Sequence, residues 1–198
     1  MSTNRLESFS DGVIAVAITL LVLNIAVPTA RSNQSLAHAL GQQWPIYAAY
    51  VTSFVTIGII WINHHTAISR LRCADHMVLV INLLLLMSIA VLPFSTSLMA
   101  AYLKASSGQH LAAAVYSGML LVMSLLFSLL NRHILFAEPD LVGPELSRER
   151  RRIILRRGVT GLAPYAVATG LAPVTPYATL AICAAVAAFY ALPVAQGN

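Results

Sequence analysis

Apolar segments about as long as a membrane is thick recur along this chain, and they constrain its fold more than any other feature. A run of about 20 apolar residues crosses the hydrocarbon core of a bilayer as a helix. The chain has 198 residues, of which 58% are hydrophobic and only 10% are charged, whereas soluble domains average about 25% charged residues. So few charged side chains could not cover a soluble core of this size. We therefore expect an all-α integral membrane protein.

Six segments are apolar enough to predict transmembrane helices, and we expect them to form a single domain over residues 1–198. The predicted helices cover residues 5–28, 44–67, 74–103, 109–134, 154–172 and 174–194. Pro93 and Pro164 lie inside two of them, where a proline bends or breaks the helix. The one long loop expected is 137–157, and residues 31–41 are expected to form a polar loop with one short helical turn.

The net charge of +5 is better explained by membrane topology than by binding to nucleic acid. If the N-terminus is cytoplasmic, six helices bring both termini to the inner side. Of the 12 lysines and arginines, only Arg31 and Lys104 then lie outside, as expected from the excess of basic residues in cytoplasmic loops. The basic run 148–157 is interpreted as an inner-side anchor that also contacts anionic lipid headgroups.

Residues 5–12, with the sequence RLESFSDG, place acids, a base and two hydroxyls at the mouth of the first apolar segment. An ionisable group at membrane depth is expensive and therefore marks a candidate functional site. Asp11 needs a partner there, and the second helix offers Trp61, Asn63, His64 and His65. We expect a hydrogen-bonded cluster rather than a metal site, because adjacent histidines on a helix point about 100° apart. The acids also argue against a cleaved signal peptide.

A narrow apolar stripe runs along the first helix at about 100° per residue. It consists of Phe9, Val16, Leu20, Leu23 and Val27. Arg5, Gly12 and Thr19 flank the stripe on one side, and Asp11 lies nearly opposite. Such a stripe is either a seam for helix packing or the wall of a pore. In a pore, apolar rings can gate by dewetting and hydroxyls can replace ion hydration. Periodicity alone does not choose between the two.

The motif Arg5-x-x-x-Phe9-Ser10-Asp11-Gly12 and the apolar run after it resemble the first helix of the transmembrane protein 175 family of lysosomal and prokaryotic potassium channels. The segment Trp61-Ile62-Asn63-His64-His65 resembles the second helix of that family. Asp75 and the Leu-rich segment 82–96 resemble the third. The resemblance covers about residues 5–100, and the six-helix count extends it to the whole chain.

The resemblance implies a potassium-preferring cation leak channel without a carbonyl filter loop, in the bacterial inner membrane. It implies a homotetramer in which the first helix lines the pore, with membrane lipids and monovalent cations as partners. The family's hydrophobic constriction maps onto Val16, with Leu20 and Leu23 as further rings, and its selectivity-linked threonine maps onto Thr19. Its structural cluster maps onto the motif and the second helix, at Arg5, Phe9, Ser10, Asp11, Gly12, Trp61 and His64 or His65. It implies potassium in the pore but no cofactor, metal or catalytic residue.

Three alternatives compete with the channel. A secondary or proton-coupled transporter is disfavoured, because the sequence has no inverted repeat and no second acid at midplane depth. A membrane enzyme would need a nucleophile and a base that converge on a pocket, and no nucleophile motif is present. An accessory subunit without transport activity remains open at this point.

Overall fold

The computed structural model describes residues 3–28, 35–136 and 147–192, and most of these residues lie in helices. In chain order the helices are α1 (Thr3–Leu20), the 3₁₀ helix η1 (Leu21–Asn24), α2 (Leu36–Gln42), α3 (Trp44–Ile68), α4 (His76–Tyr102), α5 (Gln109–Phe136), α6 (Arg148–Thr160), α7 (Leu162–Leu171) and α8 (Pro176–Ala191). The expected all-α architecture is confirmed.

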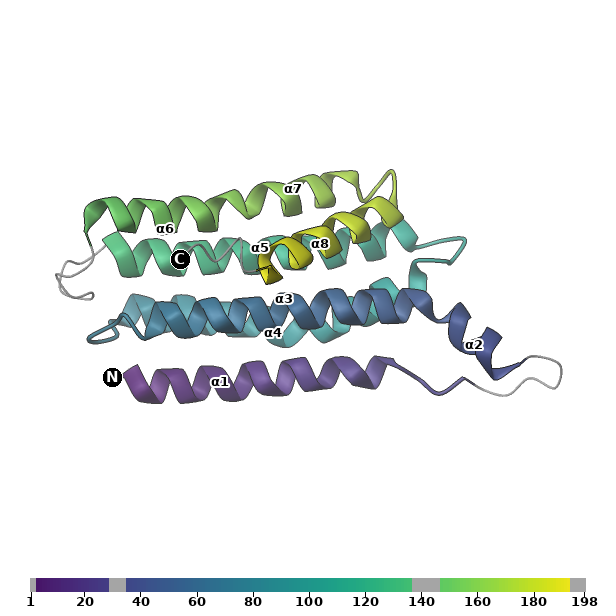
Figure 1. Ribbon diagram of the computed structural model, residues 1–198, viewed down its shortest axis with the longest axis horizontal. Helices are drawn as coiled ribbons and strands as arrows, with labels where there is room; N and C mark the ends of the chain where they lie inside the picture. Colours follow the sequence, from purple (N-terminus) through teal and green to yellow (C-terminus); the bar gives the residue numbers. More distant parts are fainter. Residues whose placement is uncertain (1–2, 29–34, 137–146, 193–198) are drawn as a thin grey trace.

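The long helices lie side by side in one bundle, with α1 on one flank and the α6–α7 pair on the other (Figure 1). Helices α3 and α4 lie next to α1, and α5 and α8 lie between them and α6–α7. In the described part of the chain, α1 contacts α3, α4 and its own continuation η1, and no other helix. One side of α1 is therefore left without a neighbour from the described part of the chain.

Over residues 3–28, 35–136 and 147–192, four helical segments are long and apolar enough to cross a membrane, namely Thr3–Asn24, Trp44–Ile68, His76–Tyr102 and Gln109–Phe136. The chain is accordingly a multi-pass membrane protein. The fifth and sixth predicted spans correspond to the α6–α7 pair and to α8, which are shorter or more polar than these four. The count of six spans stays a prediction.

Two helix boundaries differ from those expected. The first helix ends at Asn24 instead of residue 28, because the chain becomes extended at Ile25, with φ −88° and ψ 90°, and Pro28 disfavours helix at the residue before it. The region expected as a loop over 137–157 is helical from Arg148 onwards. Ser147 caps this helix, since its side chain accepts a hydrogen bond from the backbone N–H of Arg150, and arginine is a good helix former.

The two prolines inside predicted helices behave differently. Pro164 follows the break between α6 and α7 at Gly161, because its ring clashes with the carbonyl four residues earlier, that of Thr160. Helix α4 instead continues through Pro93. The carbonyl of Pro93 accepts hydrogen bonds from two side chains, Asn24 and Ser97.

Hydroxyl groups join three of the helices in the core. Ser53 Oγ of α3 lies 2.8 Å from Thr96 Oγ1 of α4 and 3.0 Å from the hydroxyl of Tyr116 of α5. All three side chains are buried, so their polar atoms satisfy one another away from solvent. Helices α3, α4 and α5 thus form the scaffold against which α1 packs.

The described arginines gather at one end of this bundle. The N-terminus of α1, the connection from α3 to α4, the end of α5 and the start of α6 lie at that end (left in Figure 1). The described arginines belong to these segments. Lys104 lies at the opposite end, where its Nζ donates hydrogen bonds to the carbonyl and the side chain of Gln42.

Candidate functional site

The apolar stripe of α1 and η1 faces away from the rest of the chain. Val16 is 58% exposed, Leu20 is 43% exposed and Leu23 is 74% exposed. Phe9 and Val27 are exposed as well. The opposite side of the helix is buried against α3 and α4 through Leu6, Ser10, Ile14 and Ala17. The stripe is therefore available to other molecules along its whole length.

The change from α-helix to 3₁₀ helix keeps this stripe on one face. Val16 and Leu20 are four residues apart in the α-helix and share a face there. Leu20 and Leu23 are three residues apart at the start of the 3₁₀ segment, and side chains at this spacing are aligned in a 3₁₀ helix. The three apolar side chains consequently lie in one row.

Thr19 is the hydroxyl residue beside this row, and it is exposed. Its Oγ1 donates a hydrogen bond to the carbonyl of Val16 at 2.8 Å. Both the packing and the pore interpretations allow this backbone bond. Since the hydroxyl proton is used in the bond, the oxygen keeps its lone pairs as acceptors. The exposed face thus carries an oxygen that can accept a hydrogen bond or coordinate a cation.

A directional chain of hydrogen bonds anchors the inner half of α1. His64 Nε2 lies 2.7 Å from Asn82 Oδ1, and Asn82 Nδ2 donates to Ser10 Oγ at 3.0 Å. Ser10 Oγ in turn donates to the carbonyl of Leu6 at 2.8 Å. His64, Asn82 and Ser10 are buried. This chain connects α3 and α4 to the buried side of α1.

Two further contacts join α1 to α3 nearer the surface. Trp61 Nε1 donates a hydrogen bond to Asp11 Oδ1 at 2.9 Å. His65 Nδ1 lies 2.7 Å from Glu7 Oε1. Asp11 is half-buried and Trp61 is exposed, so the carboxylate of Asp11 stays partly accessible. Its hydrogen bond to Trp61 directs it toward α3 and away from the stripe.

The structure pairs Asp11 with Trp61, as the expected cluster has it, but it gives the two histidines partners other than Asp11. Asp11 meets Trp61, whereas His64 meets Asn82, which was not among the candidate residues. An asparagine in an otherwise apolar helix needs a polar partner, and this signal could have identified Asn82. Among the described residues, Arg5 makes no hydrogen bond or ion pair and is exposed.

Phe9 and Gly12 lie on the open side of α1. Phe9 is exposed, and a Cβ added at Gly12 would meet no atom within 4 Å. Together with Val16, Leu20 and Ala90 of α4 they line an open hollow of about 560 Å³ between α1 and α4. This hollow lies beside the stripe and offers space for side chains of another molecule.

A second anchor fixes the outer end of the stripe. Asn24 Nδ2 donates to the carbonyl of Pro93 at 3.4 Å, and Ser97 Oγ donates to Asn24 Oδ1. Both partners belong to α4, so η1 is attached to the scaffold where α1 ends. Because polar contacts hold the helix near both ends, the rotation of the stripe about the helix axis is fixed.

Asp75 lies just before α4 and caps the start of that helix. Asp75 accepts a hydrogen bond from the backbone N–H of Val78 at 2.7 Å and lies 2.7 Å from His133 Nε2. Burial alone would raise the pKa of Asp75, but these two partners together hold it below its ordinary value. In the described part of the chain, no group of three or more His, Cys, Asp or Glu residues is arranged to hold a metal ion.

The known proteins that are similar to this chain are named as ion channels. Residues 5–93 match the family described as endosomal/lysosomal potassium channel TMEM175. A protein of Streptomyces collinus named as a potassium channel is 43% identical over 188 residues, which cover 95% of this chain and 91% of that protein. A protein of Chamaesiphon minutus, also named as a potassium channel, is 36% identical over 192 residues, covering 96% of this chain and 94% of that protein. The crystal structure of a lysosomal potassium-selective channel TMEM175 homolog from Chamaesiphon minutus matches with a TM-score of 0.85 at 36% identity and covers 96% of each chain.

Proposed function

This chain belongs to the TMEM175 family, and we propose from this membership that it forms a potassium-preferring cation leak channel. The family is one of ion channels and not of enzymes. The relatives from Streptomyces collinus and Chamaesiphon minutus, both named as potassium channels, match this chain over nearly its whole length. The resemblance inferred from the Arg-x-x-x-Phe-Ser-Asp-Gly motif is thereby confirmed.

We base the proposed permeation path on one feature of α1, its open and rotationally fixed stripe. Thr19 places a hydroxyl oxygen on the open stripe, and because its proton is bonded to the carbonyl of Val16, the oxygen keeps its lone pairs as acceptors. In a water-filled path the same oxygen can contact a cation. The polar anchors lie away from the stripe, at Asp11, Ser10 and Asn24, so they orient the helix without entering the path.

In this proposal Val16, Leu20 and Leu23 form the gate. Their side chains carry no group that coordinates a cation, so rings of them hold a narrow dry segment that resists hydrated ions. Thr19 supplies an oxygen beside these rings and contributes to the preference for potassium. Phe9 and Gly12 border the path at its inner end, while Arg5 faces the adjoining solution.

A pore lined by one helix per chain requires several chains, and we propose a homotetramer. Four copies of α1 around an axis would close the stripe into rings, and the hollow between α1 and α4 would receive side chains of a neighbouring copy. The match to a channel structure over 96% of the chain supports such an assembly. In it, the α6–α7 pair and α8 provide the fifth and sixth spans on the periphery.

The proposed orientation of the protein in the membrane follows from the position of its arginines. The end of the bundle that carries the described arginines is placed in the cytoplasm, as expected from the excess of basic residues in cytoplasmic loops. With six spans both termini then lie on the cytoplasmic side of a bacterial inner membrane. The arginines of α6 contact the anionic headgroups there.

The decisive experiment uses purified protein in liposomes under a potassium gradient. We expect a passive potassium flux that falls when sodium replaces potassium and that persists when a protonophore collapses any proton gradient. A flux that stops with the proton gradient would indicate a coupled transporter. Absence of flux from protein that is correctly assembled would indicate an accessory subunit.

A further inference from the structure

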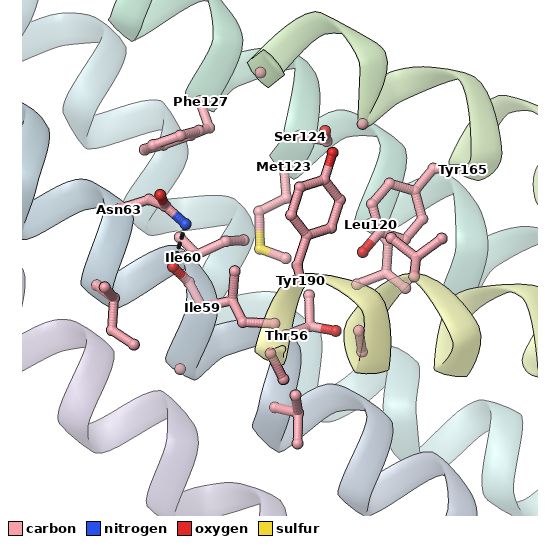
Figure 2. A pocket seen from close by; sticks show the side chains of 18 of the residues that line it. Thr56, Ile59, Ile60, Asn63, Leu120, Met123, Ser124, Phe127, Tyr165 and Tyr190 are labelled. Carbon is pink, nitrogen blue, oxygen red and sulfur yellow. Dashed lines mark hydrogen bonds between the residues drawn. The ribbon is translucent and has the colours of Figure 1, made fainter. Parts of the chain in front are cut away.

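A cavity of about 640 Å³ lies on the side of α3 that faces away from α1 (Figure 2). Helices α3, α5, α6, α7 and α8 contribute to its wall. Tyr190 and Ala191, the last residues of α8, also line it. Glycines widen it, because Gly58, Gly158 and Gly161 present no side chain to the space. The proposed pore does not use this cavity.

The lining of the cavity is amphipathic along its length. Toward one end the wall includes the apolar side chains of Phe54, Leu120 and Val186. Figure 2 shows Tyr165 and Thr56 near Leu120, Ser124 and Tyr190 next to them, and Phe127 of α5 and Asn63 of α3 farther along the cavity. The other end is polar and includes Thr66, Arg70 and Asn131. Such a gradient is matched by a molecule that has an apolar chain and a polar head.

Arg70 gives the polar end a positive charge. Its side chain is half-buried and, among the described residues, has no acidic partner and no hydrogen bond. Burial lowers the pKa of its guanidinium, which nevertheless stays charged at neutral pH. The arginine-rich helix α6 borders the same end through Ile154. A half-buried cation without a partner favours an anionic group beside it.

We propose that an anionic phospholipid, from the leaflet at the Arg70 end of the bundle, inserts one acyl chain into this cavity and places its phosphate beside Arg70. From Phe54 to Thr66 the cavity follows α3 for about 18 Å, at 1.5 Å per residue. The acyl chains of one leaflet occupy about 15 Å, half of the hydrocarbon core. The cavity is thus long enough to hold one acyl chain of a phospholipid.

The charge of the cavity favours a lipid over a second copy of this protein. A neighbouring copy seated here would have to offer an acid to Arg70. The acids in the described part of the chain are Glu7, Asp11, Asp75 and Glu149. The first three are already engaged with His65, Trp61 and His133, which leaves Glu149, an exposed acid in the first turn of α6, as the acid that a second copy could offer from the described residues. An anionic lipid supplies the charge and the apolar chain together.

Native mass spectrometry of the purified protein tests the proposal, because it counts retained lipids without reference to ion flux. The probes are dioleoyl phosphatidylglycerol, dioleoyl phosphatidylcholine and glycerol 1-phosphate, which carries the headgroup chemistry without chains. We expect phosphatidylglycerol to be retained in preference to phosphatidylcholine and glycerol 1-phosphate not to be retained. Retention of glycerol 1-phosphate alone would assign the site to a free phosphate and overturn the proposal.

Two pairs of variants distinguish the binding of the acyl chain from the binding of the lipid headgroup. Arg70→Gln should lower the preference for phosphatidylglycerol about fivefold, the effect of about 1 kcal/mol for one basic residue near the membrane. Its control is Arg132→Gln, which removes an exposed arginine outside the cavity. Gly58→Leu fills the cavity and should abolish tight retention of both phospholipids. Its control is Gly170→Leu, since a Cβ at either glycine meets no atom within 4 Å.

The outcomes decide between occupants. If Gly58→Leu does not fold, Ser124→Leu fills the same cavity from α5. Unchanged retention in the variants relative to their controls would overturn the proposal. A cavity-filling variant that changes the oligomeric state without changing lipid retention would assign the cavity to a neighbouring copy and also overturn it.

Discussion

The side-chain oxygen of Asn82 lies 2.7 Å from Nε2 of His64, in a place closed to solvent between α3, α4 and α1. Because the amide nitrogen of Asn82 donates to Ser10, its oxygen must accept from His64. Nε2 therefore carries the imidazole proton, and Nδ1 is left as a buried acceptor without a partner among the residues that the structure describes. Adding a proton to Nδ1 would bury an unpaired N–H, so this arrangement favours the neutral imidazole.

The Asn82→Ala variant should be less stable than the wild-type protein by about 1–3 kcal/mol, because it leaves the N–H of His64 buried without an acceptor. The midpoint of thermal unfolding in detergent measures the loss. Asn4→Ala is the matched control, since the side chain of Asn4 is exposed near the start of α1. Equal midpoints for the two variants would contradict the structural importance of Asn82.

Replacing Asp75 with alanine should destabilise the protein at neutral pH by about 1 kcal/mol, because Asp75 caps α4. The pKa of Asp75 is lowered in the folded protein. Its stabilising effect is therefore present above the ordinary pKa of an aspartate and is lost as the pH falls through the lowered value. The difference between Asp75→Ala and wild type should shrink when the pH falls below about 4.

Thermal unfolding at neutral pH and at about pH 3 checks this sign. Glu149→Ala provides a control for a general acid effect, because Glu149 is an exposed acid in the first turn of α6. A difference for Asp75→Ala that stays constant between the two pH values would show that the charge of Asp75 does not stabilise the folded state.

The long helices of this fold could be predicted from the sequence because an apolar run of sufficient length has few alternatives in a membrane. The ends of the helices were harder to predict from the sequence. Helix α6 begins at Arg148 because Ser147 caps it, and such a cap depends on one local hydrogen bond. Hydropathy placed that basic run in a loop, because arginine counts as polar although it favours helix.

The sequence indicated that the stripe and Asp11 lie on different sides of the first helix, because both follow from the helical period alone. The pairings could not be deduced in the same way. Asn24 contacts Pro93 and Ser97, and Asn82 lies 72 positions from Ser10. Contacts at such separations depend on how α4 packs against α1, and the period of one helix does not contain this information.

Cysteine cross-linking tests the proposed assembly around α1. In a Cys73→Ser background, which removes an exposed thiol, Leu23→Cys should form disulfide-linked dimers under mild oxidation. Asn24→Cys should do so much less, because Asn24 faces α4 and a disulfide requires Cα atoms within about 7 Å. Equal cross-linking at both positions, or a monomer in mild detergent, would argue against a pore lined by α1.

Polar substitutions at the proposed gate should increase ion flux. Val16→Asn or Leu23→Asn brings hydrogen-bonding groups into a dry constriction and should wet it, while Val16→Phe should narrow it and reduce flux. Liposome flux normalised to assembled protein is the measurement. Val51→Asn is a suitable control, since Val51 is an exposed apolar residue of α3 outside the stripe. A packing seam would instead respond to Val16→Asn with misfolding and no gain of flux.

Replacing Thr19 with valine should weaken the preference for potassium over sodium more than it changes expression or assembly. The two side chains are nearly the same shape, but valine lacks the oxygen that remains available as an acceptor when Thr19 bonds to the carbonyl of Val16. Flux with potassium and with sodium, measured on the same preparation, gives the ratio. Thr169→Val is the control, because Thr169 also bonds to a carbonyl of its own helix, that of Tyr165, and lies in α7 away from the stripe. If flux and ion preference are unchanged in Thr19→Val and in the Val16 variants, and the protein still assembles, the permeation path lies outside α1.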